Sequence, residues 1–292
     1  MKPFFASIAV TIFLSCSAYG QKAYTLKFNP ANGSKYDAVT SIKTKTFQNV
    51  MGQDIEFNMD YDVNMSYNIA AEGANKKLRM TYDRLKMKMD AMGQVVNMDS
   101  SDPDSSNVAS KAFRALKGQT VEVVLNPDGK VVKVEGSEEI LQKLGADEMQ
   151  KQAMKGVLGE DVMNSLMEQS FGFYPDKPVK AGDSWTSTVT LKSPYIISAT
   201  STYTLAKVEG KKAFIDIVGG LHTDSTSKLT VNGIEMDLDL TGDVSGNTEV
   251  DIETGMPLTT TIRQTLKGNI EVQGQKIPMA SNIDTQITVT KK

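Results

Sequence analysis

The sequence has very few of the side chains that carry out chemistry in enzymes. Its 292 residues include one cysteine, one histidine and one tryptophan. A Ser–His–Asp site would depend on His222, and no Gly-x-Ser-x-Gly segment supplies a nucleophile for it. A zinc site would need three carboxylates beside that histidine, which is an uncommon ligand set. Because the phosphate-binding loop and the dinucleotide fingerprint are also missing, the sequence predicts no catalytic residue, no metal site and no cofactor.

The one cysteine, Cys16, lies in an N-terminal segment that has the features of a signal peptide. A lysine precedes an apolar run from Phe4 to Leu14, and Ala18-Tyr19-Gly20 is a small-x-small cleavage site. We expect residues 1–20 to be removed, which leaves a mature chain with no cysteine. The alternative is a lipoprotein signal, with a lipid anchor at Cys16. Both signals predict export to the periplasm or outer envelope of a bacterium, in the second case as a membrane-anchored lipoprotein.

Charge and long apolar runs are also sparse. The formal net charge is −3, and no basic patch is interleaved with aromatic residues. Nucleic-acid binding therefore is not expected. No segment after the N-terminal one is long and apolar enough to form a membrane-spanning helix, so we expect none in the mature chain.

Alternation of apolar and polar residues is the clearest pattern in the sequence. Apolar side chains occupy every odd position from Ile55 to Ile69, and polar side chains occupy every even position from Asp54 to Asn68. Such a period of two predicts a strand with one buried face and one solvated face. At about 3.3 Å per residue the strand would be roughly 50 Å long, so we expect a strongly curved sheet.

The next strand predicts a bulge. Its apolar residues occupy even positions at Leu78, Met80 and Tyr82, and odd positions from Leu85 to Met89. A shift of one position is the effect of a β-bulge, and bulges bend strands. Further strands are joined by turn segments, which are Met51-Gly52, Met92-Gly93, Asn126-Pro127-Asp128-Gly129, Asn232-Gly233, Thr254-Gly255 and Gln273-Gly274.

The middle of the chain, residues 137–174, has a helical pattern instead. Ser137 followed by two glutamates favours a helix start, and apolar residues recur from Ile140 at helical spacing. Val162, Met163, Leu166 and Met167 form another apolar stripe. The sequence therefore predicts a mainly β protein with a few helices, in which a large curved antiparallel sheet or partial β-barrel is covered by central amphipathic helices.

The domain organisation follows from the same pattern. We expect one β-rich domain over residues 21–292, with no linker. The alternative is two β halves, residues 21–136 and 178–292, joined by the helical segment 137–174. A Gly-x-x-aromatic segment begins each half, at Gly33 and Gly182, which is consistent with a weak internal duplication or with convergent turn chemistry.

Paired carboxylates are the remaining enzymatic option. Asp237 and Asp239 fall on one face of a predicted strand, as do Asp60 and Asp62. General acid–base catalysis needs a carboxyl with a raised pKa in a cleft, whereas these side chains alternate with apolar ones and should be solvated. For this reason a carboxylate-dependent hydrolase is only the second alternative. The acidic run Asp99–Asp104 lacks the spaced glycine and distal glutamate of a calcium-binding EF-hand loop.

Two segments carry a family resemblance. Gly118-Gln119-Thr120-Val121-Glu122-Val123-Val124-Leu125-Asn126-Pro127-Asp128-Gly129-Lys130-Val131-Val132-Lys133-Val134-Glu135-Gly136 and Val179-Lys180-Ala181-Gly182-Asp183-Ser184-Trp185 resemble an uncharacterised family of exported bacterial β-rich proteins, known as a domain of unknown function. The resemblance brings no catalytic residues. The expected architecture is also similar, at the level of fold, to periplasmic carriers of lipids and lipoproteins.

Together these patterns favour an exported, non-catalytic envelope protein. We expect it to bind a hydrophobic ligand, a lipid or acyl chain, between the curved sheet and the helices. The residues predicted to line this site are apolar and rich in methionine, and they are Phe57, Met59, Tyr61, Met65, Met87, Met89, Met163 and Met167. The first alternative is a structural or protein-interaction module of the cell envelope with a filled core.

Overall fold

A computed structural model describes residues 22–50, 52–104, 106–107, 109–143, 158–191, 196–224, 227–231 and 234–292. The predicted signal peptide, residues 1–20, lies outside the described residues, and so does part of the predicted helical segment, residues 144–157. The strands and helices are β1 (Lys35–Val50), β2 (Gln53–Glu72), β3 (Asn75–Ala91), β4 (Gln94–Asp99), α1 (Lys111–Leu116), β5 (Thr120–Leu125), β6 (Val131–Glu135), α2 (Ser137–Lys143), α4 (Glu160–Phe171), β7 (Ser184–Leu191), β8 (Ile197–Glu209), β9 (Lys212–Thr223), β10 (Lys228–Val231), β11 (Ile234–Asp251), β12 (Pro257–Val272) and β13 (Gln275–Lys291).

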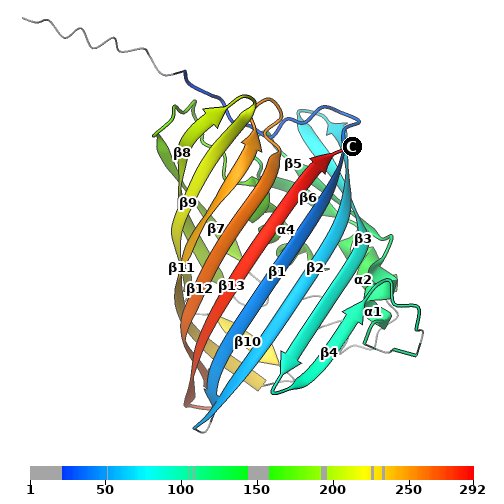
Figure 1. Cartoon of the computed structure of the whole chain (residues 1–292), viewed down its shortest axis with the longest axis vertical. Coiled ribbons are helices and arrows are strands. Elements are labelled where there is room, and N and C mark those ends of the chain that lie inside the picture. The colour runs from blue at the N-terminus through cyan, green and yellow to red at the C-terminus, as the bar shows by residue number, and fades with distance from the viewer. Residues whose placement is uncertain are drawn as a thin grey trace, which may run out of the picture.

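The strands form one antiparallel sheet in the order β6-β5-β3-β2-β1-β13-β12-β11-β9-β8-β7, while β4 also pairs with β3 and β10 with β11. The sheet is open, and β6 and β7 are the two ends of this strand order. It curves strongly, with long tilted strands side by side (Figure 1). The predicted fold, a large curved antiparallel sheet with a few helices, is confirmed.

Alternation decides which side chains face the concave side of the sheet. On β2 the odd residues Val63, Tyr67 and Ile69 are buried, whereas the even residues between them are polar. The same parity continues to Ile55, so the whole predicted apolar face of β2 points inward. Burying that face against helices and against the opposite part of the curved sheet removes apolar surface from water, at about 25 cal/mol per Å².

The predicted bulge is present on β3. Asn64 of β2 pairs with Arg84, whereas its neighbour Met65 pairs with Tyr82, so one residue of β3 is left over. The extra residue returns Leu85 to the inward face, where it is buried. Because an unpaired residue increases the local twist, the bulge helps to curve this side of the sheet.

Glycines bend the other side of the sheet, which was not predicted from the sequence. Gly242 and Gly246 occupy inward positions on β11, opposite β12. A Cβ atom on Gly242 would lie 1.8 Å from the carbonyl oxygen of Thr265, and one on Gly246 would lie 2.1 Å from that of Thr261. Only glycine permits this close approach of two strands, so these positions allow the sheet to fold over itself.

Two inner strands change neighbours part-way along their length. β3 pairs with β5 near its start and with β4 near its end, and β11 pairs with β10 near its start and with β9 near its end. A hydroxyl completes the hydrogen bonding at each change. The backbone N–H of Leu85 donates to Ser100 Oγ (2.9 Å), and that of Leu240 donates to Thr223 Oγ1 (2.9 Å). These hydroxyls therefore satisfy the backbone N–H groups of Leu85 and Leu240 at the points where the neighbouring strand changes.

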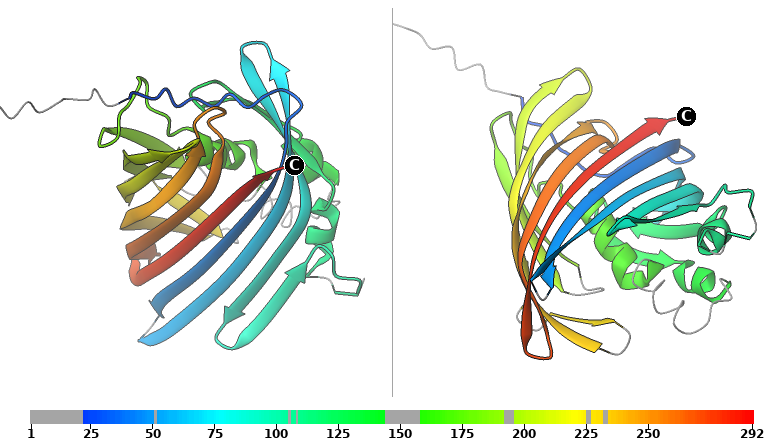
Figure 2. Two further views of the ribbon diagram at one scale, coloured as in Figure 1. Left: turned by 45° about the horizontal axis from the view of Figure 1, so that its top comes forward. Right: turned by 60° about the horizontal axis from the view of Figure 1, so that its bottom comes forward.

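Helix α4 closes the gap between the two edges of the sheet. It packs against β6 on one side and β7 on the other. The hydroxyl of Ser165 donates to the backbone carbonyls of Asp161 (2.8 Å) and of Thr190 on β7 (3.3 Å). Figure 2 shows the sheet curving around this helix. The prediction that central amphipathic helices cover the sheet is confirmed for α2 and α4, while residues 144–157 between them lie outside the described residues.

An N-terminal segment, residues 22–34, crosses one end of the sheet, which we call the core end. Phe28 N–H donates to Pro127 O (2.8 Å) in the β5–β6 turn, and Asn29 N–H donates to Thr254 O (2.8 Å) in the β11–β12 turn. Lys27 forms an ion pair with Asp128. The alternating apolar residues of this segment, Tyr24, Leu26 and Phe28, form no strand within the described residues beyond a single bridge between Tyr24 and Val179. The apolar side chains instead fill the end of the core.

The starts of β1 and β7 make the same hydrogen bonds. Gly33 N–H donates to Ile69 O (2.8 Å), and Ile69 N–H donates to Ser34 O (3.0 Å). In the same way, Gly182 N–H donates to Leu205 O (2.7 Å), and Leu205 N–H donates to Asp183 O (3.0 Å). A duplication would produce this equivalence, but the division into one domain or two halves stays a prediction.

Candidate functional site

The candidate site lies on the inward face of the sheet, at the end opposite the core end. This end carries the β1–β2, β3–β4 and β12–β13 turns, which lie at the bottom of Figure 1. We call the part of the sheet near it the far half, which comprises β4, β10 and residues 42–50, 53–61, 85–91, 234–240, 264–272 and 275–285. The core end is filled by a continuous cluster of buried side chains, including Phe28, Phe171 and Met256.

A group of apolar side chains in the far half faces inward without joining the core. They are half-buried, and they belong neither to the core cluster nor to the side chains packed against it. We call this group the far apolar face, and its members are Ile42, Val50, Ile55, Phe57, Met59, Met87, Met89, Val96, Met98, Met236, Val272 and Ile277. Apolar side chains that are grouped on one face and left partly exposed often mark a place where another molecule binds.

Strand register brings five of the predicted site residues together. Met59 pairs with Met89 and Tyr61 pairs with Met87, while Phe57 is next along the inward face of β2. Side chains opposite each other on antiparallel strands lie about 5 Å apart at Cβ, so they form a continuous surface. This contact between β2 and β3 follows from their alternation and the short turn between them.

The other three predicted site residues lie nearer the core. Met65 is half-buried and packs against the core cluster. Met163 and Met167 of α4 are 3% and 8% exposed, and the Tyr82 hydroxyl lies 4.0 Å from the sulfur of Met163. These methionines fill space between the helix and the sheet. Whether any of the eight residues contacts a ligand stays a prediction.

Aromatic side chains separate the core from the far apolar face. The rings of Tyr61 and Phe113 of α1 meet edge to face, with 6.1 Å between their centroids. Burial raises the pKa of Tyr61 and of Tyr67 to about 12. Burial, and then the nearby Tyr61 and Tyr67, raise the pKa of Tyr82 as well. The three phenols therefore lie close together in a poorly solvated layer, and α1 covers it from inside. Helix α1 begins at Lys111.

The outer face of the sheet carries its charges. Lys45 and Glu56 form an ion pair (2.9 Å), as do Arg263 and Asp284 (2.8 Å). Asp237 pairs with Lys228 (3.7 Å) across exposed side chains. The carboxylates considered for a hydrolase, Asp60, Asp62, Asp237 and Asp239, are exposed on this outer face. They point away from the far apolar face, so they do not form a catalytic pair with it.

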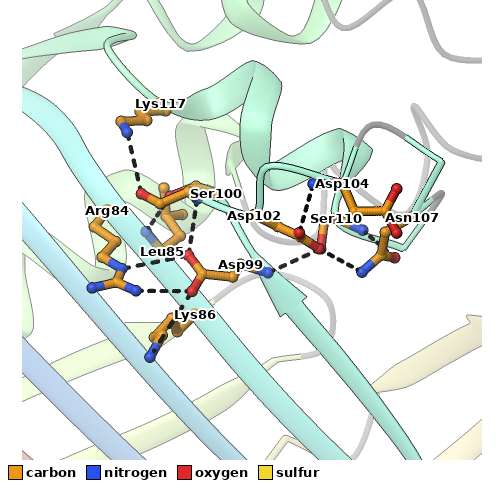
Figure 3. Close-up of polar contacts among 11 residues, drawn as sticks. Arg84, Leu85, Lys86, Asp99, Ser100, Asp102, Asp104, Asn107, Ser110 and Lys117 are labelled. Atoms are coloured by element: carbon orange, nitrogen blue, oxygen red, sulfur yellow. Dashed lines mark hydrogen bonds and ion pairs between the residues drawn. The ribbon is translucent and has the colours of Figure 1, made fainter.

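The acidic run after β4 organises a loop (Figure 3). Asp99 pairs with Arg84 (2.9 Å), whose guanidinium holds the pKa of that carboxyl below its usual range. Asp102 accepts hydrogen bonds from Asp104 N–H (2.9 Å), Asn107 Nδ2 (2.7 Å) and Ser110 Oγ (3.2 Å). The backbone N–H of Asp104 and then the Asn107 amide lower the pKa of Asp102. Each carboxylate thus has its own partners, and among the described residues no cluster suited to a metal ion is found.

Two depressions lie away from the far apolar face. One, of about 430 Å³, is lined by Lys77, Arg79, Thr120, Glu122, Glu135 and Gly136. Lys77 lies within 3.6 Å of each of three glutamates there, so its charge is already compensated. The other, of about 220 Å³, lies between β6, α4 and β7 and is mostly polar. Neither combines apolar lining with converging polar groups, as small-molecule sites usually do.

A family comparison covers most of this architecture. Residues 73–257 match a family of unknown function, DUF6263. The chain belongs to this family. The matched part runs from the β2–β3 turn to the start of β12 and includes the helices, which confirms the predicted membership in a domain of unknown function. A search of curated proteins finds no match.

Solved structures add a likeness of fold. A structure described as lipid–protein interactions in lipovitellin aligns with a TM-score of 0.52 and 6% identity, over 89% of this chain and 25% of that chain. This family member thus spans a quarter of the lipovitellin chain that it matches. At this identity the likeness shows the fold alone.

Two other aligned structures are less similar. An outer membrane channel from Pseudomonas putida F1 aligns with a TM-score of 0.27 and 7% identity, over 90% of this chain and 97% of that chain. OccK7 from Pseudomonas aeruginosa aligns with a TM-score of 0.25 and 6% identity, over 89% of this chain and 100% of that chain. These scores are too low to relate the folds. In the described part of the chain, no helix has the length and apolar character needed to cross a membrane.

Proposed function

We propose that this protein is an exported, non-catalytic envelope protein that binds a hydrophobic ligand, a lipid or acyl chain, on the far apolar face. The observation that carries the proposal is that this face is apolar, inward-facing and not packed against the core. Because Phe57, Met59 and Met89 are only half-buried, covering them with a hydrocarbon chain would be favourable, at about 0.8 kcal/mol for each buried CH₂ group. Unbranched methionine side chains adapt to ligands of different shape.

The fold supports the same proposal. Lipovitellin, whose structure is described in terms of lipid–protein interactions, shares the general architecture of this chain. A curved open sheet provides a concave surface that can be apolar, while its outer face stays charged. The pairs Lys45–Glu56 and Arg263–Asp284 keep the outer face soluble. The comparison supplies an architecture and no ligand, so the ligand must be found by experiment.

Export is part of the proposal. The signal at residues 1–20 would direct the chain to the periplasm or outer envelope, and lipidation at Cys16 would anchor it in a membrane. The mass of the mature protein, purified from the native host, distinguishes the two forms. Cleavage after Gly20 gives a chain that begins at Gln21, and a Cys16→Ser variant keeps this mass. If Cys16 carries a lipid, the wild-type mass rises instead and the variant loses the lipid. An uncleaved chain in the cytoplasm would contradict export.

Binding is tested with one pair of variants. Met59→Lys places a charge on the far apolar face, and Asn58→Lys places the same charge on the outer face of the same strand. Native mass spectrometry and lipid extraction of the mature protein should find a bound lipid, and an apolar dye should gain fluorescence. We expect Met59→Lys to lose at least tenfold in dye affinity, and Asn58→Lys to lose little, because a desolvated ammonium is costly.

The alternative function is a structural or interaction module with a filled core. The large buried cluster at the core end is consistent with it. If the wild-type protein carries no lipid and gives no dye fluorescence, although circular dichroism shows that it is folded, the binding function is wrong and this alternative is favoured. Equal dye binding by both lysine variants would place the dye elsewhere and contradict the far apolar face as the site.

A further inference from the structure

In the far half, the inward face of the sheet carries no charge at the positions that the structure describes. On β1 the inward residues run from Tyr36 to Val50 at even positions, and on β13 they run from Ile277 to Val289 at odd positions. All of them are uncharged, and so are the described inward positions of β2, β3, β4, β11 and β12 within the far half. Two lysines, Lys76 of β3 and Lys291 of β13, have inward register but lie at the core end of the sheet. An ionised headgroup placed against this face would therefore find no counter-charge, and burying an unpaired charge costs several kcal/mol.

The inward face is nevertheless not wholly apolar. A patch of uncharged polar side chains crosses β1, β13 and β12 in the far half, and its members are Thr44, Thr46, Gln48, Gln264, Ser281 and Thr285. Strand register holds the patch together, because Thr44 and Gln264 both pair with Ile283 of β13. The hydroxyls of Thr46 and Ser281 lie 2.9 Å apart and hydrogen-bond to each other.

The two glutamines in the patch have unused hydrogen-bonding groups. Within the described part of the chain, the side-chain amides of Gln48 and Gln264 make no hydrogen bond to another residue. Both side chains are half-buried and face the same side as the far apolar face. An amide offers two N–H donors and a carbonyl acceptor, so it can bind an ester, alcohol or amide group without any charge.

The apolar surfaces lie on both sides of this patch. Phe57 and Met59 of β2 flank it on one side, and Leu266 and Ile270 of β12 flank it on the other. A molecule with an uncharged polar group between hydrocarbon arms would match this order of surfaces. It would hydrogen-bond to the patch and cover the apolar side chains on either side.

We infer that the ligand is an uncharged lipid, such as a lipid ester, in preference to a lipid with an ionised headgroup. This inference rests on the proposed function, because it specifies the ligand of the same face. The juxtaposition that supports it is a charge-free apolar wall with free glutamine amides in its middle. A fatty acid, by contrast, would keep its carboxylate in water outside the face and would bury less of its chain.

The test compares two fluorescent ligands that differ only at the polar end. One is a labelled long-chain fatty acid and the other is its methyl ester, both measured well above the carboxyl pKa of about 4 to 5. We expect the mature wild-type protein to bind the ester at least tenfold more tightly. Equal affinity, or a preference for the acid, would overturn the inference and leave the proposed function standing. If neither ligand binds the folded protein, the proposed function fails as well.

Variants at Gln264 test the role of the patch. Gln264→Lys should reverse the preference, because it supplies a counter-charge for the carboxylate. Thr261→Lys is the matched control, since it adds the same charge on the exposed outer face of β12 and should leave the ratio of affinities unchanged. Gln264→Leu should weaken ester binding about fivefold, as expected for one lost hydrogen bond, without weakening an alkane probe. A ratio unchanged by Gln264→Lys would contradict the inference.

Discussion

The indole N–H of Trp185 donates a hydrogen bond to the backbone carbonyl of Phe173, across 2.5 Å. This bond joins the edge strand β7 to the segment that follows α4. Ser187 on the same strand donates to Gly172 O (3.1 Å), so two side chains fasten the helix to this edge. The rings of Trp185 and Tyr203 also stack, with centroids 6.0 Å apart. The only tryptophan of the sequence therefore lies where α4 packs against the edge strand β7.

Trp185→Phe should destabilise the protein by about 1–2 kcal/mol, because it leaves the Phe173 carbonyl without its donor while keeping an aromatic ring. The measurement is urea unfolding followed by circular dichroism. Thr188→Ala, on the exposed outer face of β7, is the control and should change the free energy of unfolding by less than about 0.5 kcal/mol. Similar values for both variants would show that this hydrogen bond does not stabilise the closure.

Gly129→Ala should be much more damaging. Gly129 has φ 75°, and a Cβ atom there would lie 1.7 Å from Phe171 O, at the end of α4. We expect a loss of about 3–5 kcal/mol from overpacking together with left-handed strain. Gly210→Ala is the control, since its φ is 58° and nothing lies within 4 Å, and it should cost only about 1–2 kcal/mol. Thermal unfolding measures both, and equal losses would mean that α4 is not held against this turn.

Alkaline pH should unfold the protein through its buried tyrosines. Burial raises the pKa of Tyr67 from 10.0 to about 12, so the folded state holds this proton more tightly than the unfolded chain. The resulting stability is fully present below pH 10 and is lost as the pH rises towards 12. Tyr67 alone accounts for roughly 3 kcal/mol over this range. Tyrosinate absorbance should appear together with the loss of circular dichroism.

Tyr67→Phe separates this effect from general alkaline damage. The variant should lose less stability between pH 10 and 12 than the wild-type protein does, because the phenylalanine has no proton to release. If Tyr67 ionises near pH 10 while the sheet stays folded, the layer formed by Tyr61, Tyr67 and Tyr82 is solvated and the expected linkage is absent.

Acid should loosen the loop that follows β4. The pKa of Asp102 is lowered by backbone and side-chain hydrogen bonds, so its contribution is present above about pH 4 and is lost as the pH falls below that value. Hydrogen exchange should show that the backbone N–H of Asp104 loses protection on acidification, and at neutral pH in Asp102→Ala. Asp90→Ala, which removes the acceptor for Gly93 N–H at the β3–β4 turn, should leave the loop protected. An unchanged exchange rate in Asp102→Ala would contradict this role.

Local patterns were sufficient to predict several of the strands and turns. The alternation from Ile55 to Ile69, the phase shift before Leu85 and the turn at Asn126–Gly129 are all found where they were expected. Each depends on neighbouring residues in the sequence. Glycines inside a strand pattern indicate a bend, so the bending at Gly242 and Gly246 could have been predicted from the sequence as well.

The arrangement of the strands could not be predicted in the same way. The sequences of β1 and β13 do not predict that Ala38 pairs with Val289, because this pairing depends on the arrangement of the whole sheet. The exchange of neighbours at Ser100 and Thr223 is equally non-local.

The candidate site was predicted only in part. The group Phe57, Met59 and Met89 was expected from alternation on two adjacent strands, whereas the polar patch around Gln264 was missed because it spans strands from both ends of the sequence. Met163 and Met167 lie in the core, because α4 is held between the two edges of the sheet.

The pairing of β1 with β13 has a consequence for folding. These strands form the centre of the sheet, yet the paired positions Thr46 and Ser281 are 235 residues apart in sequence. During synthesis, β1 therefore lacks one of its two neighbouring strands until β13 has been made. High contact order of this kind slows folding, and an unpaired strand invites aggregation. Any organism that makes this protein must keep the nascent chain in solution until its two distant strands meet.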